Sequence, residues 1–176
     1  MKGIYAGSYD PPTNGHLWMI EQGSKLFSKF YIAVGENSQK EYTFSTDERL
    51  AMLKEICAEF NNVEVIQFEN KFLVKYAESI GVDYILRGIR NEKDYTYERG
   101  MRYVNSNMNA TIQTLFMMSP RYLVEVSSSL VKGLVGSDGW EQVVREYVPE
   151  SVYRRMLQKF GKTQPHHTSR KILERI

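Results

Sequence analysis

The sequence is poor in cysteine and shows little net charge. Cys57 is the single cysteine among 176 residues, so the chain cannot form an internal disulfide or a four-cysteine zinc site. A reducing cytoplasm is therefore the expected location. The 23 basic residues nearly cancel the 21 acidic ones, giving a formal net charge of +2. So small a charge argues against nucleic acid or an anionic membrane as the binding partner.

Long apolar runs are also missing. No segment approaches the roughly 20 apolar residues of a membrane-spanning helix, and residues 1–10 contain no apolar stretch of signal-peptide length. We expect a soluble and unprocessed protein. Hydrophobic residues make up 42% of the chain, which suits one domain with an ordinary core. That domain is expected at 1–160, and 161–176 reads as a frayed or partner-docked tail.

Short strand-like runs alternate with helix-like segments. Strands are predicted at 3–7, 30–34, 63–66, 84–86 and 114–118. Helices are predicted at 17–27, 45–56, 73–80, 95–108, 127–131, 140–147 and 150–160, the second opening with a Ser45–Glu48 capping box. This alternation predicts an α/β fold of Rossmann-like, doubly wound type: a mostly parallel five-stranded sheet with helices on both faces and C-terminal helices. Ligands of such sheets bind at the carboxyl ends of the strands.

The first predicted loop suits a phosphate group. It runs from Gly7 to His16, with Ser8 near the strand end and His16 at the start of a helix. Backbone N–H groups and the helix dipole favour anions there, and an imidazole can donate a hydrogen bond to a phosphoryl oxygen. The alternative is a structural histidine that caps the helix. The loop has neither a P-loop nor a Gly-x-Gly-x-x-Gly pattern, which removes the best support for nucleotide hydrolysis or ordinary dinucleotide binding.

Three cations follow predicted strands. Lys40 comes after the second strand, and Arg87 and Arg90 are expected just beyond the end of the fourth. Each alone would be an ordinary solvated charge, but at one edge of a sheet they would converge on phosphate together with His16. Ser127, Ser128 and Ser129 add hydroxyls at a predicted helix start, of which an ordinary N-cap explains only one.

These motifs together resemble a known family. Thr13-Asn14-Gly15-His16 matches the Thr/His-x-Gly-His signature of a nucleotidyltransferase superfamily, and the resemblance is close to the phosphopantetheine adenylyltransferases over residues 3 to about 160. Supporting segments are 7–11, Lys40 with Phe44-Ser45, 87–90, 94–98 and 126–131. Family members transfer the adenylyl group of ATP to 4′-phosphopantetheine, with Mg²⁺, giving dephospho-coenzyme A and pyrophosphate. The reaction is a direct in-line attack without a covalent enzyme intermediate.

The resemblance also implies residue roles. His16 would stabilise the transition state at the α-phosphate, and Lys40 and Arg90 would share the catalysis. Acceptor binding is implied for Ser8, Lys40, Leu73 and Arg87. ATP binding is implied for Ser8, Tyr9, His16, Gly88, Ile89, Arg90, Glu98, Leu123, Val124, Glu125, Val126, Ser127, Ser128 and Ser129. No protein side chain is predicted to ligate the metal, because ATP phosphates and water can hold Mg²⁺.

The chain departs from the family pattern at several positions. Ser8 and Tyr9 replace the usual Thr and Phe, Glu36–Gln39 lacks a usual proline, Glu41 replaces a frequent lysine, and Asn70–Phe72 differs beside the expected pantetheine arm. Two alternatives therefore stay open: another phosphorylated acceptor, such as nicotinamide mononucleotide or a glycerol or sugar phosphate, or a nucleotide-binding module without turnover. The family further implies a homohexamer and feedback binding of coenzyme A.

Overall fold

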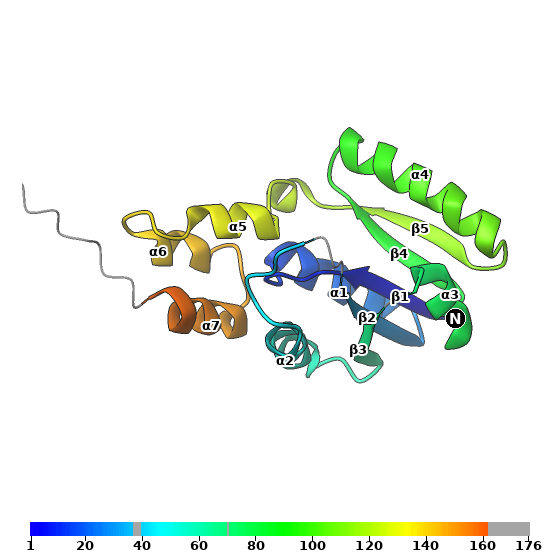
Figure 1. Ribbon diagram of the computed structural model, residues 1–176, viewed down its shortest axis with the longest axis horizontal. Coiled ribbons are helices and arrows are strands. Elements are labelled where there is room, and N and C mark those ends of the chain that lie inside the picture. The colour runs from blue at the N-terminus through cyan, green and yellow to red at the C-terminus, as the bar shows by residue number, and fades with distance from the viewer. Residues whose placement is uncertain (37–39, 70, 162–176) are drawn as a thin grey trace, which may run out of the picture.

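The computed structural model describes residues 1–36, 40–69 and 71–161. Its centre is one sheet of five parallel strands: β1 (Lys2–Gly7), β2 (Lys29–Gly35), β3 (Val63–Phe68), β4 (Tyr84–Ile89) and β5 (Gln113–Met118). The strand order is β3-β2-β1-β4-β5, so the chain direction across the sheet reverses between β1 and β4 (Figure 1). The predicted doubly wound parallel sheet is confirmed, and its switch point marks where a ligand site is expected.

Seven helices connect and extend the described strands. They are α1 (Asn14–Leu26), α2 (Thr46–Cys57), α3 (Leu73–Ser79), α4 (Glu92–Met108), α5 (Ser128–Leu134), α6 (Trp140–Arg145) and α7 (Glu150–Phe160). A short 3₁₀ turn, Arg121–Leu123, precedes α5. The last three helices extend as a group away from the sheet (Figure 1).

Two cores lie on opposite faces of the sheet, as the alternation of strand side chains requires. In β1, Ile4 faces one core and Tyr5 the other. The larger core takes apolar side chains from α1, α2, α6 and α7, whereas the smaller takes them from α3 with a contribution from α4. The expected helices on both faces are therefore present.

Close packing of α1 on β2 depends on Gly23. A Cβ at this position would lie 2.2 Å from the Phe30 ring, so only glycine lets the helix approach the strand this closely. The Ser45 cap predicted for α2 is also present, since its hydroxyl accepts a hydrogen bond from the backbone N–H of Glu48 and the Glu48 carboxylate accepts one from Ser45. The predicted capping box thus marks the start of α2 correctly, whereas α1 begins at Asn14, earlier than the predicted 17.

Several predicted boundaries are wrong. Strand β4 continues to Ile89 because its pairing with β5 persists as far as Ile89 opposite Met118, so Arg87 and Gly88 lie within the strand and not beyond it. Helix α4 begins at Glu92 and not at 95, because the Asn91 side chain caps it by accepting from the N–H of Asp94. Helix α6 ends at Arg145 and β3 runs on to Phe68. Most of the predicted tail, 162–176, is outside the described residues.

Candidate active site

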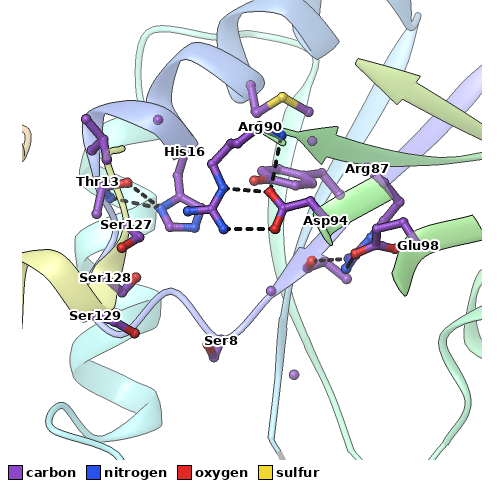
Figure 2. A pocket seen from close by; sticks show the side chains of 18 of the residues that line it. Ser8, Thr13, His16, Arg87, Arg90, Asp94, Glu98, Ser127, Ser128 and Ser129 are labelled. Atoms are coloured by element: carbon purple, nitrogen blue, oxygen red, sulfur yellow. Dashed lines mark hydrogen bonds and ion pairs between the residues drawn. The ribbon is translucent and has the colours of Figure 1, made fainter. Parts of the chain in front are cut away.

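A pocket of about 700 Å³ opens where β1, β2 and β4 end. Its walls come from the loop after β1, the segment after β2, the end of β4 with α4, and the start of α5 (Figure 2). This volume lies within the range of small-molecule sites, roughly 300–1,000 Å³. The pocket therefore occupies the position that the strand reversal predicts, and it has room for a ligand of nucleotide size.

Most residues predicted for the site line this pocket. They are Ser8, His16, Lys40, Leu73, Arg87, Gly88, Arg90, Glu98, Leu123, Val126, Ser127, Ser128 and Ser129. Four predicted residues do not line it: Tyr9, Ile89, Val124 and Glu125. Tyr9 is buried, with its hydroxyl donating to the carbonyl of Tyr5 and its backbone in the left-handed region at φ 50°. The ATP contacts predicted for these four residues stay predictions.

His16 is held in one tautomer by the start of α1. The backbone N–H of Thr13 donates to His16 Nδ1 at 3.0 Å, and the Thr13 hydroxyl lies 2.9 Å from the same nitrogen (Figure 2). Because a backbone N–H can only donate, Nδ1 must be the acceptor, and the ring proton of the neutral form is on Nε2. Burial and the nearby charge of Arg90 lower the pKa of His16 from 6.5 to about 4. At neutral pH His16 is thus an uncharged hydrogen-bond donor.

Both pocket arginines are paired with carboxylates of α4. Arg87 donates through Nε to Glu98 Oε2 at 2.8 Å and through Nη2 to Glu98 Oε1, and its Nη1 reaches the carbonyl of Ala6 at 2.9 Å. Arg90 donates through Nε to Asp94 Oδ2 at 2.8 Å and through Nη2 to Oδ1 at 3.2 Å (Figure 2). Two guanidinium forks therefore face the pocket with one carboxylate each.

The two arginine–carboxylate pairs determine the charges on this side of the pocket. Burial opposes the charge on Arg87, but the hydrogen bonds from Arg87 to Glu98 outweigh it and raise the arginine pKa. Burial likewise opposes ionisation of Asp94, but hydrogen bonds from the side chain and backbone of Arg90 outweigh it and lower the aspartate pKa. Arg87 and Asp94 are consequently charged near neutral pH.

The three serines have three different surroundings. Ser127 is the N-cap of α5 and accepts from the N–H of Leu130 at 3.1 Å. Ser128 donates to the carbonyl of Pro11 at 2.8 Å, which ties α5 to the loop after β1. Ser129 is exposed and lines the pocket. Two of the hydroxyls thus have structural partners while all three residues remain at the pocket surface.

Sequence reasoning missed several lining residues. Asp94 belongs to the segment that carried the resemblance, and its position four residues after Arg90 was an available signal for an ion pair. Glu36 and Tyr42 also line the pocket on either side of Lys40, but nothing in their local sequence singled them out. Thr13 was recognised only as part of the signature, and its role as the partner of His16 required the structure.

Metal ligands are not grouped in the described chain. Among residues 1–36, 40–69 and 71–161, no three His, Cys, Asp or Glu side chains are placed so that they could hold a metal ion. The pocket carboxylates of Asp94 and Glu98 instead pair with arginines.

Within residues 1–36, 40–69 and 71–161, no helix has the length and apolar character needed to cross a membrane.

Comparison with known proteins agrees with this architecture. The family model described as Cytidylyltransferase-like matches residues 4–134, so the chain is a member of this nucleotidyltransferase class. The solved structure of nicotinic acid mononucleotide adenylyltransferase from Plasmodium falciparum, in complex with NaAD, superposes with a TM-score of 0.64. It covers 90% of this chain and 97% of its own, and at 16% identity it supports the fold alone.

Closer relatives narrow the class. A phosphopantetheine adenylyltransferase from Chromobacterium violaceum is 54% identical over 160 residues, covering 91% of this chain and 98% of its own. The phosphopantetheine adenylyltransferase of Neisseria meningitidis serogroup C is 48% identical over 156 residues, covering 89% and 92%. With this identity over nearly the full length of both relatives, the chain belongs to the phosphopantetheine adenylyltransferase family.

Proposed function

We propose that this chain transfers the adenylyl group of ATP to 4′-phosphopantetheine, forming dephospho-coenzyme A and pyrophosphate. The observation that carries the proposal is the set of phosphate-binding groups around one pocket: neutral His16 with its Nε2 proton, Lys40, and the two arginines Arg87 and Arg90. The near full-length similarity to phosphopantetheine adenylyltransferases supports the choice of acceptor.

The proposed reaction is a direct displacement at phosphorus. A phosphate oxygen of the acceptor attacks the α-phosphorus of ATP, a new P–O bond forms, and the bond to the β-phosphate oxygen breaks. Pyrophosphate leaves with the bonding electrons. No covalent enzyme intermediate is needed, because positioning and charge stabilisation suffice for such a transfer.

Each wall of the pocket has a proposed part in this step. Ser8 and Lys40 hold the attacking phosphate, and Arg87 with Leu73 binds the rest of the acceptor. The Nε2–H of His16 donates to the α-phosphate oxygen where negative charge develops, which fits a neutral donor that gives up no proton. Arg90, Gly88 and Glu98 with the segment 123–129 bind ATP. The ATP contacts of Tyr9 and Ile89 stay predictions, because neither residue lines the pocket.

Mg²⁺ is proposed to bind together with ATP and not to protein side chains. The pocket's cationic groups and its arginine-bound carboxylates suit phosphate oxygens better than a bare divalent cation, so ATP phosphates and water would supply the ligands. When bound, Mg²⁺ supplies charge neutralisation to the triphosphate.

A pyrophosphate-release assay tests the reaction and the acceptor together. Purified protein is incubated with ATP, Mg²⁺ and 4′-phosphopantetheine, nicotinamide mononucleotide, glycerol phosphate or a sugar phosphate, with the His16→Ala variant as the background control. Release only with 4′-phosphopantetheine is the expected result. Release only with another acceptor overturns the substrate assignment, and no release with any acceptor indicates a nucleotide-binding module.

The remaining family properties are also proposed for this chain: assembly as a homohexamer, inhibition by coenzyme A, and a cytoplasmic location. Exposed Tyr95, Tyr97, Tyr103, Met118 and Tyr122 would suit an interface between subunits. We propose that 1–160 is the catalytic domain and that 161–176 is an appended tail. Sedimentation at six times the chain mass of 20.5 kDa would support the hexamer, and sedimentation at the monomer mass would overturn it.

A further inference from the structure

Arg49 is a fully buried cation that does not line the pocket. It lies in α2, and four of its five N–H donors have partners. Nη1 donates to the carbonyl of Ser8 at 2.8 Å and Nε to the carbonyl of Phe44 at 3.1 Å. Nη2 donates to Glu36 Oε1 at 3.1 Å and to the Thr46 hydroxyl at 2.9 Å. A buried guanidinium so occupied fixes the relative positions of its partners.

The partners of Arg49 belong to two walls of the pocket. Ser8 is in the loop after β1, and Glu36 begins the segment after β2 that carries Lys40. The ring of Tyr42, in the same segment, has its centroid 4.2 Å from the Arg49 guanidinium carbon. Arg49 therefore spans the two segments whose side chains, Ser8 and Lys40, are proposed to hold the attacking phosphate.

Asp10 ties the same two segments a second time. Its buried carboxylate accepts from the N–H of Phe44 at 2.8 Å, from the N–H of Thr43 at 3.0 Å and from Lys132 Nζ at 2.8 Å. The Phe44 residue is thus held through its carbonyl by Arg49 and through its N–H by Asp10. Lys132 is in α5, so the serine segment is attached to the same network.

We propose that Arg49 is a positioning residue for adenylyl transfer, which sets the distance between Ser8 and Lys40 by holding the backbone on both sides. The inference rests on the proposed function. Misplacing reacting groups by about 1 Å can cost on the order of 100-fold in rate. An apolar residue of similar volume often stabilises a core as well as a buried ion pair does, so core stability alone does not require a cation at this position.

The test compares Arg49→Met with Arg49→Lys and a control. Asn62→Ala is the matched control, because Asn62 also ties two segments by donating to the carbonyls of Ser24 and Phe27, but it does so at the start of β3, away from the pocket. For each variant we would measure kcat, the KM of each substrate, the Kd of ATP and of 4′-phosphopantetheine by calorimetry, and the melting temperature.

We expect kcat of Arg49→Met to fall about 10- to 100-fold at temperatures well below melting. The Kd of 4′-phosphopantetheine should rise at least about fivefold and that of ATP should rise less, because Lys40 is assigned to the acceptor alone whereas Ser8 is also predicted to contact ATP. Arg49→Lys should recover part of kcat, since one ammonium reaches some of the carbonyl acceptors but not all of them. Asn62→Ala should lower the melting temperature and leave kcat unchanged.

A purely structural role predicts the opposite pattern. If Arg49→Met melts earlier but keeps wild-type kcat and both Kd values, the positioning role is overturned. If Arg49→Met does not fold, Arg49→Lys decides: a reduced kcat with a larger loss of acceptor affinity than of ATP affinity supports the role, and wild-type kinetics overturns it. If the wild-type chain shows no turnover, the proposed function fails, and the two Kd values alone decide whether Arg49 positions the acceptor side of the pocket.

Discussion

His16 lies in the β1 wall of the pocket (residues 8–16) and is fixed by a main-chain N–H. The arginines of the β4 wall (residues 87–98) are held mainly by side-chain carboxylates, although Arg87 also donates to the main-chain carbonyl of Ala6. A main-chain partner is part of the fold and cannot be replaced by a ligand. A carboxylate has the same sign of charge as a phosphate and binds the same guanidinium fork, so an incoming phosphate can compete with it. The β1 wall thus provides fixed geometry, and the β4 wall provides exchangeable charge.

The largest expected effect concerns the β1 wall. His16→Ala removes the donor proposed for the transition state and should lower kcat about 10²–10³-fold, with little change in ATP binding. Steady-state kinetics and calorimetry measure the two quantities. Thr13→Val is the matched control: it keeps the backbone N–H that fixes the tautomer, so its kcat should fall less than about tenfold. Near-normal turnover of His16→Ala would remove His16 from the mechanism.

A smaller effect is expected in the β4 wall. Arg90→Met should weaken ATP binding about 10- to 100-fold, since hydrogen bonds to charged groups contribute about 1.5–3 kcal/mol. The loss should shrink between about 0.1 M and 1 M salt, where the screening length falls from roughly 10 to 3 Å. Calorimetry at both salt concentrations measures the effect.

Asp94→Asn is the control for that variant, because it keeps Arg90 and a hydrogen-bond acceptor of the same size. Its ATP affinity should stay within about fivefold of wild type. If Asp94→Asn weakened ATP binding as much as Arg90→Met, the carboxylate would be an essential holder of the arginine and not an exchangeable one, and the contrast between the walls would fail.

Protonation of His16 should affect stability and activity only at acidic pH. With the pKa of His16 at about 4 in the folded protein and 6.5 unfolded, the unfolded state binds more protons between these values. The His16 contribution to stability is therefore present above about pH 6.5 and is lost as pH falls towards 4. Activity should show no His16 titration from pH 6 to 8. A step in the wild-type pH profile near 6.5 that disappears in His16→Ala would contradict this assignment.

The smallest effect on activity is expected outside both walls. Gly23→Ala places a Cβ against the Phe30 ring and should lower the free energy of unfolding by about 1–3 kcal/mol. Denaturant unfolding measures this change, and kcat should stay within about twofold of wild type. A large loss of kcat without loss of stability would show that the pocket walls respond to packing at the far side of α1.

Local signals in the sequence predicted much of the fold. The alternation of elements, the Ser45 cap and the helix over 150–160 were right because each depends on neighbouring residues. The end of β4 was misplaced because pairing with β5, more than 20 residues away, extends the strand through the polar Arg87 and through Gly88. Long-range pairing of this kind has no signature in the local sequence.

Site residues could be predicted from the sequence where they belong to a recognisable motif. Lys40, Arg87 and Arg90 were expected near strand ends and His16 at a helix start, and all four line one pocket. The tautomer of His16 and the bonds of Arg49 were beyond the sequence, because each depends on which backbone atom faces which side chain. A charged residue in an amphipathic helix gives no local sign that it will be fully buried.

Arg49 donates a hydrogen bond to the main-chain carbonyl oxygen of Ser8 and none to the Ser8 hydroxyl. The location of this loop is therefore independent of the side chain that it presents. We therefore expect that threonine could replace Ser8 without changing the hydrogen bond that holds this loop. If Ser8 binds the acceptor as proposed, substitutions at position 8 should change acceptor binding while the main-chain hydrogen bond to Arg49 is kept.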